Sequence, residues 1–387
     1  MAHEMPCPAD TARSLWQAWW QALLEVVRDK GVLLLLAGAP VLYGFFYPWF
    51  YGPEVVQRVA VAVVDQDGSG LSRQITRFVQ ASPRLDLRWV GNDEASAQRA
   101  LLRGEIEGYL LLPPDLKRHV VRGQAVSATV QANAAYPLVS KAVQLGFAEA
   151  VGTASAGVEM RQLQARGQSA WQAQLGREPV RLQSLALFNP VEGYGSFVVP
   201  AVALIILQQT LLMGVAMRVA TWAEAGRQRA SARAWAGRLL AFCTLGGISG
   251  LFYFGWIFLM NAYPSGGNPL GALVLLALYV PAVAVLGSLL GWWMANRERV
   301  LQVLLFTALP LAFLAGFSWP AEALPGPLQA LRWLAPSTAG IQASLRLNQL
   351  GASLADAWPQ LLALLALGLG GLLGLCWLHR PWARRPA

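Results

Sequence analysis

Residues 239–296 read LLAFCTLGGISGLFYFGWIFLMNAYPSGGNPLGALVLLALYVPAVAVLGSLLGWWMAN. This run contains no charged residue, and it is too long for one membrane-spanning helix, which needs about 20 apolar residues. Its middle, NAYPSGGNP at 261–269, is rich in turn-forming residues. The run therefore predicts two spanning helices, at 239–260 and 270–294, joined by a turn.

The rest of the sequence follows the same pattern. Charged residues make up only 13% of the 387 residues, whereas soluble proteins carry about 25%. Four further windows lack charge and are long enough for a spanning helix. They lie at 31–50, 196–217, 300–318 and 357–378. We therefore expect an α-helical polytopic membrane protein with six transmembrane helices.

Basic residues are distributed unequally between the segments that join these spans. Thirteen Lys and Arg lie in the N-terminal segment 1–30, the loop 218–238, the link between the fourth and fifth spans, and the tail 379–387. The opposite short loops contain only Arg332 and Arg346. Since short cytoplasmic loops are enriched in Lys and Arg, both termini are expected in the cytoplasm. This distribution explains the net charge of +9, so nucleic acid is not expected as a partner.

The long segment between the first two spans, 51–195, is then expected outside the membrane. Its pattern alternates between strands and helices. Strands are predicted at 59–64, 85–90, 106–112 and 126–131, with helices at 71–80, 92–104 and 115–122 and a long helix at 137–164. This order predicts an extracytoplasmic mixed α/β domain inserted between helices 1 and 2.

Two shorter segments are expected at the membrane surfaces. Residues 13–29 place Trp16, Trp19 and Trp20 on one apolar stripe and Glu25 on the other side, which is typical of a helix lying in the membrane interface. Residues 319–356 contain short amphipathic pieces that cannot span a bilayer. We expect them at the outer surface and partly re-entrant.

Motifs for catalysis or for binding a cofactor are missing. The sequence has no GxxxxGK[S/T], no GxSxG, no HExxH and no paired cysteine motif. The stretch DQDGSG at 65–70 begins like a calcium loop, but Thr76 stands where the closing Glu would be. A turn in which Ser69 or Asp67 caps the next helix is the simpler interpretation. No charged residue interrupts a predicted span, so the energy for any transport must come from a partner.

The order of several short motifs resembles the permease subunit of an ABC-type exporter, in the type 2 permease branch with a large extracytoplasmic domain between the first two spans. The motifs are EVVRDK at 25–30, VVDQDGS at 63–69, FNP at 188–190, FVVP at 197–200, FSWP at 317–320, LP at 324–325 and PSTAG at 336–340. The resemblance implies export across the inner membrane, with ATP and Mg bound by two copies of a separate subunit and no cofactor on this chain. It also implies a second permease, the same or a related chain. Membrane lipid and a periplasmic adaptor are further candidate partners.

The resemblance also implies a site for coupling to the ATPase. Glu224, Gly226 and Arg227 match an E-x-G-T element that the family carries in the cytoplasmic loop after the second span, with Arg in place of Thr. We expect these residues to contact the ATP-binding subunit. The simpler interpretation is that Glu224 pairs with Arg227 on a solvated helix face.

Polar residues inside the predicted spans are the candidates for a substrate pathway or for the seam between two permeases. They are Gln208, Gln209 and Thr210 in the second span and Gln302 and Thr307 in the fifth. Hydrogen bonding between helices explains such residues equally well.

Two functions compete with the exporter hypothesis. One is a membrane-anchored binding or secretion scaffold that uses the outer α/β domain. The other is a membrane enzyme, which the absence of a catalytic cluster makes a weak candidate. A neighbouring gene for an ATPase would separate the exporter from the scaffold.

Overall fold

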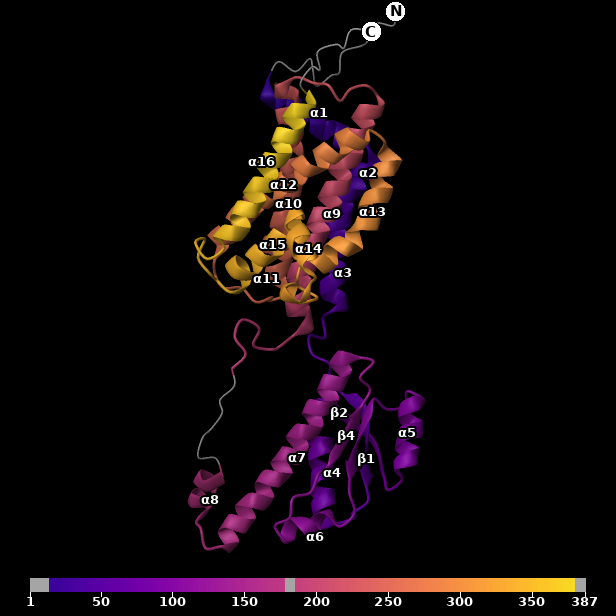
Figure 1. The fold of residues 1–387 in the computed structure, drawn as a ribbon, viewed down its shortest axis with the longest axis vertical. Coiled ribbons are helices and arrows are strands. Elements are labelled where there is room, and N and C mark those ends of the chain that lie inside the picture. Colours follow the sequence, from indigo (N-terminus) through magenta and orange to yellow (C-terminus); the bar gives the residue numbers. More distant parts are fainter. Residues whose placement is uncertain (1–13, 178–184, 380–387) are drawn as a thin grey trace, which may run out of the picture. The chain divides into compact units, whose positions relative to one another are not determined.

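A computed structural model describes residues 14–177 and 185–379. The chain forms two compact units. Unit 1 contains the residues up to Glu54 and from Ala186 onward, and unit 2 contains Val55–Leu185. Unit 1 is helical, whereas the strands lie in unit 2 (Figure 1).

Unit 1 is built from long helices and a few short turns. Its helices are α1 Leu15–Arg28, α2 Lys30–Leu33, α3 Ala39–Phe50, α9 Tyr194–Glu224, α10 Ala232–Leu251, α11 Phe258–Met260, α12 Pro269–Met294, α13 Arg297–Leu314, α14 Gly326–Leu331, α15 Pro336–Ser344 and α16 Trp358–His379. Turns of π-helix at Leu34–Gly38, Phe252–Ile257 and Leu345–Gln349 continue α2 into α3, α10 into α11, and the end of α15. Short 3-10 turns lie at Ala321–Ala323 and Arg332–Leu334.

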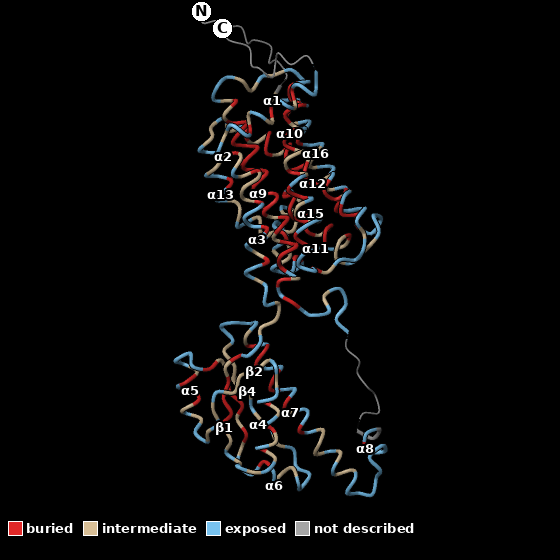
Figure 2. The backbone as a smooth tube through the Cα atoms, turned by 180° about the vertical axis from the view of Figure 1, so that it is seen from behind, coloured by how far each residue is buried: buried red, intermediate tan, exposed pale blue. Residues whose placement is uncertain are grey.

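Helix α9 forms the centre of unit 1, and Figure 2 shows buried residues along much of its length. Helix α12 packs closely beside it because glycines allow the backbones to approach. A Cβ atom added at Gly287 would lie 3.0 Å from the carbonyl oxygen of Leu212, and one at Gly291 would lie 2.3 Å from that of Ala216. Small residues at such contacts are the usual means of packing helices in membranes.

The break in backbone hydrogen bonding at Pro40 is compensated by a side chain from α10. Pro40 has no N–H, so the carbonyl of Leu36 one turn earlier lacks its helical partner. The hydroxyl of Ser249, on α10, donates to this carbonyl at 3.3 Å, and the hydroxyl of Tyr253 donates to the carbonyl of Pro40 at 2.8 Å. These bonds also fasten α10 beside the first long helix.

Five helices among the described residues are long and apolar enough to cross a membrane: Lys30–Phe50, Tyr194–Glu224, Ala232–Met260, Pro269–Met294 and Trp358–Leu378. Helix α13, at the place of the fifth predicted span 300–318, is not one of them. It has 18 residues, begins with Arg297, Glu298 and Arg299, and ends at Leu314. The predicted span 300–318 began after these three charged residues and continued past the last residue of the helix.

The directions of the helices are clear from their contacts. Gly368, Gly371 and Gly374 of α16 lie against Ala282, Val285 and Leu289 of α12 in the same order, so these two helices run parallel. Helix α12 ends where α13 begins, and α16 begins at the other end of unit 1. The chain must therefore cross unit 1 once more between α12 and α16, and α13 is the long helix available for that crossing.

The segment 319–356, predicted as short outer pieces that are partly re-entrant, contains α14 and α15. Helix α15 is buried along its length and packs against α9, α12 and α16. A Cβ atom at Gly340 would come within 2.4 Å of the Tyr279 ring on α12. The sequence pattern could not reveal this burial because nine residues are too few to show a clear amphipathic period.

Unit 2 is a four-stranded sheet with helices on both faces. The strands are β1 Val59–Asp65, β2 Leu85–Gly91, β3 Gly108–Leu112 and β4 Thr129–Ala132, in the order β2-β1-β3-β4. Strands β1, β2 and β3 are parallel, and β4 is antiparallel to β3. The helices are α4 Gly70–Ala81, α5 Glu94–Leu102, α6 Leu116–Val121, α7 Pro137–Ala165 and α8 Ala170–Arg177.

Alternating side chains of β1 form the two small cores of unit 2. Val61 and Val63 pack with α4 and α7, whereas Ala62 and Val64 pack with α5. The expected strands, helices and long helix are all present, with bounds that differ by a few residues. Ser69 caps α4, and Asp65 accepts hydrogen bonds from the N–H groups of the turn that follows it, as the non-metal interpretation of this stretch predicts.

Candidate functional site

Charged residues converge at one end of unit 1, where α1, α9 and α13 meet. We call the group formed by Glu25, Asp29, Arg218, Trp222, Arg227 and Arg297 the junction cluster. Glu25 and Asp29 lie at the end of α1, Arg218 and Trp222 on the last turns of α9, and Arg297 at the start of α13. Local sequence places them there: Asp29 ends α1 and caps α2, with its carboxylate accepting from the N–H of Val32 at 3.2 Å.

Glu25 is the acceptor at the centre of the junction cluster. Its carboxylate accepts hydrogen bonds from the guanidinium of Arg218, from Nε1 of Trp222 at 2.7 Å and from Nη2 of Arg227 at 2.9 Å. Its side chain is only 16% exposed. Burial raises the pKa of Glu25, but the hydrogen bonds from Arg218 and Trp222 and the nearby positive charges outweigh it, so the net pKa lies below its usual value. Glu25 is therefore ionised at neutral pH.

Asp29 joins α1 to α13 in the same way. The guanidinium of Arg297 donates to both carboxylate oxygens of Asp29, at 2.8 Å from Nη2 and 2.5 Å from Nη1. Such a two-pronged contact fixes the orientation of both groups. The hydrogen bond from Arg297 lowers the pKa of Asp29 more than burial raises it. Nη1 of Arg218 lies 3.7 Å from the same carboxylate and links the two acidic residues.

Of the coupling residues predicted from the resemblance, Arg227 belongs to this cluster, and Glu224 and Gly226 lie beside it. Gly226 ends α9 with a φ of +69°, a backbone conformation that favours glycine. The N–H of Gly226 donates to the carbonyl of Ala223 and the N–H of Arg227 to that of Trp222, which is the Schellman pattern of helix termination. The coupling loop is therefore short: α10 begins at Ala232, and the expected loop 218–238 has become mostly helix.

Glu224 and Arg227 do not pair with each other as the simpler interpretation suggested. Arg227 donates to Glu25, as described above. Glu224 is exposed, and its Oε1 accepts from the backbone N–H of Arg297 at 2.8 Å. A carboxylate at this place satisfies a free N–H at the start of α13 and interacts favourably with the helix dipole. Glu224 thus connects the end of α9 to α13.

Helix α10 joins the same end of unit 1 through aromatic stacking. Arg238 is fully buried, and its guanidinium carbon lies 4.1 Å from the ring centre of Trp222 and 5.2 Å from that of Trp235. Such contacts between a cation and a ring are attractive, more so when water is excluded. The ring of Trp222 therefore stacks against the guanidinium of Arg238, while its N–H donates a hydrogen bond to Glu25.

Helix α1 packs on α10 through small residues. Ala18, Ala22 and Val26 are buried, and Nε1 of Trp19 donates to Thr244 of α10 at 3.1 Å. Trp16 and Trp20 remain 67% and 52% exposed. The apolar stripe predicted for this helix is therefore divided, with Trp16 and Trp20 exposed and Trp19 bound to α10.

The sequence did not identify Glu25, Asp29 and Arg297 as parts of a site. The signal that was available is the motif EVVRDK at 25–30, in which two acids sit beside a predicted span on the side that is otherwise basic. Acids at such a place are candidates for pairing with arginines from other loops. Which arginines they meet depends on how the helices pack.

The polar residues in the second predicted span lie inside unit 1. Gln208, Gln209 and Thr210 are all buried. Oε1 of Gln208 accepts from the N–H of Ser337 at 2.5 Å, and Thr210 donates to the carbonyl of Ile206 at 2.8 Å. For Gln209, neither amide atom has a hydrogen-bond partner in the described part of the chain.

The two residues from the fifth predicted span lie on α13. Gln302 is exposed, and Thr307 donates to the carbonyl of Val303 at 3.0 Å within its own helix. No hydrogen bond within the described residues joins them to Gln208, Gln209 or Thr210. Helix α13 packs on α9, but its other side exposes Leu305, Phe306, Leu309 and Phe313.

No group of three or more His, Cys, Asp or Glu that could hold a metal ion occurs among residues 14–177 and 185–379.

Comparisons with known proteins identify a family for this chain. Neither a search of curated proteins nor a search of solved structures returned a match. A family model described as ABC-2 family transporter protein matches residues 30–377. The match covers most of the chain, so this multi-pass membrane protein belongs to the ABC-2 transporter family.

Proposed function

We propose that the chain is the permease subunit of an ATP-driven exporter that moves a substrate out across the bacterial inner membrane. ATP and Mg bind to a separate subunit, present in two copies, and a second permease completes the transporter. The observation that carries the proposal is the junction cluster. Its hydrogen bonds join the three surfaces through which an ATPase could act, namely α1, the loop after α9, and the start of α13.

The contacts define a route for the mechanical coupling. A partner that pushes on the loop 225–231 moves Arg227, which is bonded to Glu25 on α1. Glu25 is bonded in turn to Arg218 and Trp222 on α9, the central helix of unit 1. Asp29 carries the same displacement to α13 through Arg297. Because packed interfaces tend to move as rigid bodies, the helices would rotate together between inward-open and outward-open states.

The proposal includes six crossings with both termini in the cytoplasm and unit 2 outside the membrane. Two observations support α13 as the sixth crossing. Helices α12 and α16 run parallel, which requires a crossing between them. The 18 residues of α13 correspond to about 27 Å at the usual helical rise, close to the thickness of the hydrocarbon core. The side of α13 that carries Phe306 and Leu309 would then face lipid or the second permease.

The experiment compares two charge-neutralising variants of the full-length chain, each assembled with its ATP-binding subunit in proteoliposomes. Glu25→Gln removes the acceptor charge of the junction cluster. Glu322→Gln makes the same chemical change at an exposed position on the 3-10 turn after α13, away from these three surfaces. The measured quantity is the ATP hydrolysis of the assembled complex relative to the isolated ATP-binding subunit.

We expect Glu25→Gln to lower this stimulated hydrolysis about tenfold or more, because a hydrogen bond to a charged group is worth about 1.5–3 kcal/mol. Glu322→Gln should leave the hydrolysis unchanged. Equal activity of Glu25→Gln and the unmodified chain would exclude the junction cluster as the coupling route. If no ATP-binding protein co-purifies with the unmodified chain, the membrane-anchored scaffold becomes the better explanation.

A further inference from the structure

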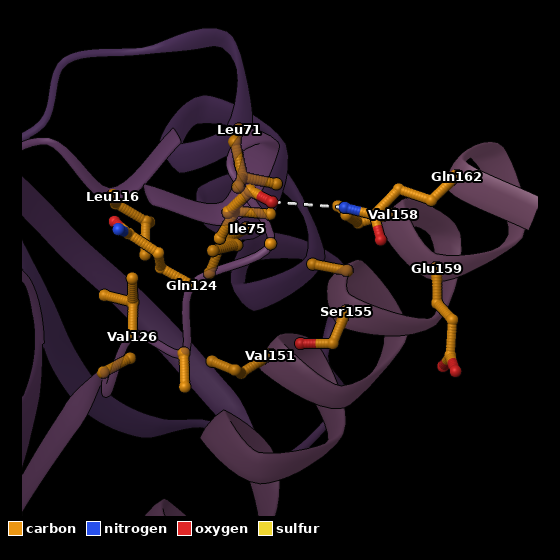
Figure 3. Close-up of a pocket in the computed structure, with 15 residues that line it drawn as sticks. Leu71, Ile75, Leu116, Gln124, Val126, Val151, Ser155, Val158, Glu159 and Gln162 are labelled. Carbon is orange, nitrogen blue, oxygen red and sulfur yellow. Dashed lines mark hydrogen bonds between the residues drawn. The ribbon is translucent and has the colours of Figure 1, made fainter. Parts of the chain in front are cut away.

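Unit 2 contains a pocket of about 640 Å³ at the carboxyl ends of β1 and β3. Helix α4 follows β1, and α6 follows β3 directly, so the first turns of both helices lie at this edge of the sheet. The long helix α7 closes the opposite side (Figure 3). Strand β1 has β2 on one side and β3 on the other. In open α/β sheets, ligands bind outside the carboxyl ends of the strands, where the strand order reverses in this way.

The interior of the pocket is apolar. Leu71 and Ile75 come from α4, Leu116 and Val120 from α6, and Val151 and Ala154 from α7. Helices α4 and α6 meet there, but the second half of α7 stands away from α6, which leaves the space open. The small side chain of Ala154 keeps that space from being filled.

Polar groups lie at the margin of the pocket. Nε2 of Gln162 donates to the backbone carbonyl of Val120 at 3.2 Å, which bridges α7 and α6, and Figure 3 shows this bond. Oε1 of Gln124 lies 2.6 Å from Nδ1 of His119. Beyond Gln124 the chain is extended, and the backbone N–H groups of Ala125 and Val126 have no hydrogen-bond partner in the described part of unit 2. Amide groups that can reorient and free backbone groups suit a ligand that carries a few neutral polar atoms.

We propose that this pocket binds an uncharged, largely apolar small molecule, with its apolar body against α4 and α7 and its few hydrogen-bonding atoms at the margin near Gln124 and Gln162. The volume lies within the range of about 300–1,000 Å³ that small-molecule sites occupy. A charged ligand is disfavoured because the apolar side chains from α4, α6 and α7 that form the interior supply no charge to pair with it. Glu159 of α7 is the charged residue in the lining, but it is exposed, and Figure 3 shows its carboxylate pointing away from these side chains. This inference concerns unit 2 alone and does not depend on the exporter proposal.

The test uses the full-length chain in lipid nanodiscs and three photoreactive probes. The first is 3-trifluoromethyl-3-phenyldiazirine, which is uncharged and apolar, and the other two are its carboxylate and trimethylammonium derivatives. After illumination, peptide mass mapping locates the adducts, so labelling of unit 2 is separated from labelling of the membrane helices. We expect saturable labelling of peptides that contain Leu116–Val126 and Val151–Val158 by the uncharged probe. Labelling there by each charged probe should be about tenfold weaker.

Two variants on α7 test whether the pocket itself is responsible. Ser155→Phe places a ring at the pocket margin on an exposed position, where it fills space without disturbing the buried core. Gly152→Phe is the matched control, because Gly152 is exposed, lies outside the pocket, and a Cβ atom added there would meet nothing within 4 Å. Circular dichroism and the labelling of the membrane helices report whether each variant is folded.

The expected result is that Ser155→Phe lowers labelling of the pocket peptides by about fivefold or more and that Gly152→Phe leaves it unchanged. Non-saturable labelling, or equal labelling in the two variants, would overturn the proposal. Equal labelling by the charged probes would overturn the assignment of ligand class. If a co-purified protein covers these peptides and excludes every probe, the pocket is a protein-docking site and the proposal fails.

Discussion

The two polar regions of unit 1 satisfy their hydrogen bonds very differently. In the junction cluster, each acidic side chain binds a positively charged group from a neighbouring segment, and the bonds join three helices. In the middle of unit 1, Gln209 and the hydroxyls of Ser337, Thr338 and Ser344 are buried without a hydrogen-bond partner in the described part of the chain. Buried polar groups are almost always satisfied in native proteins. The paired carboxylates of the junction cluster can transmit displacement, although Nε of Arg218 is buried there without a hydrogen-bond partner in the described part of the chain. The unpaired amide and hydroxyls in the middle of unit 1 are where water, a ligand or a second subunit can be accommodated.

Loss of Glu25 should have the largest effect on stability. Glu25→Ala leaves Arg218 and Trp222 without their common acceptor at a site that is largely buried. Removing one partner of a buried ion pair typically costs about 3–5 kcal/mol, so we expect a large fall in the melting temperature of the purified chain. The melting temperature is measured by thermal unfolding in detergent, with tryptophan fluorescence as the signal.

The control for this prediction is Glu298→Ala, on the same side of unit 1 but outside the junction cluster. Removing the positive partner as well, in Glu25→Ala/Arg218→Met, should recover part of the loss because no buried charge is then left unpaired. A melting temperature of Glu25→Ala equal to that of the control would mean that the cluster contributes little to stability.

Neighbouring glutamines on α9 should respond in opposite directions. Gln208→Met keeps the volume but leaves the N–H of Ser337 without its acceptor, which should cost about 1–3 kcal/mol. Gln209→Met removes two amide atoms that have no partner, so it should be neutral or stabilising. The two melting temperatures, measured side by side, test the contrast between satisfied and unsatisfied groups directly.

If Gln209→Met is as destabilising as Gln208→Met, an internal water or another group must satisfy Gln209 in the native protein. If Gln209→Met is more stable but exports less substrate, the unsatisfied amide belongs to the transport pathway. The second outcome would strengthen the prediction that Gln209 contacts the substrate.

Acid should weaken the junction cluster and leave the glutamine region unaffected. The folded-state pKa values of Glu25 and Asp29 are lowered, so their ionised forms stabilise the fold. That contribution is fully present above the unfolded-state pKa of about 4 and is lost as pH falls through the folded-state values. We expect a melting temperature that is steady near neutral pH and falls below about pH 4.

The variants Glu25→Gln and Asp29→Asn remove one of these carboxylates each, so their melting temperatures should depend less on acid. The comparison is made between the slopes of the melting temperature below pH 4, because the variants also start from lower stability. An unchanged slope in both variants would show that other carboxylates cause the acid sensitivity.

The smallest effect on stability is expected for Glu224. This side chain is exposed and makes one bond to the start of α13, and Glu224→Gln keeps an oxygen that can accept it. The lost charge at a helix N-terminus is worth about 0.3–1 kcal/mol. We expect almost no change in melting temperature, so a fall in stimulated ATP hydrolysis in this variant would report contact with the ATP-binding subunit. Unchanged hydrolysis would limit Glu224 to its bond with α13.

Much of the fold follows from local properties of the sequence. Charge-free windows predicted long helices at five places where the structure has them. A helix that spans a bilayer needs about 20 consecutive apolar residues, so such a window is a direct sign of one. In unit 2, β-branched stretches alternate with segments of helical period, and this alternation predicted the strands of the sheet and the helices between them. The start of α4 at Ser69 followed from a single capping side chain.

The site depended on contacts that no local pattern contains. Glu25 and Arg227 are far apart in the sequence, and their bond exists only because α1, α9 and the following loop meet at one end of unit 1. The simpler interpretation paired Glu224 with Arg227 from their spacing, but the turn at Gly226 directs the two side chains to different helices. The burial of α15 likewise depends on α9, α12 and α16 surrounding it.

What the sequence determined by itself, therefore, is where most of the helices and strands lie along the chain, because backbone preferences and transfer from water act residue by residue. What only the tertiary structure decided is which charges pair and which polar groups stay unsatisfied. Those outcomes are set by side-chain distances of about 3 Å between segments that the sequence keeps far apart, and such distances are determined by how the helices pack.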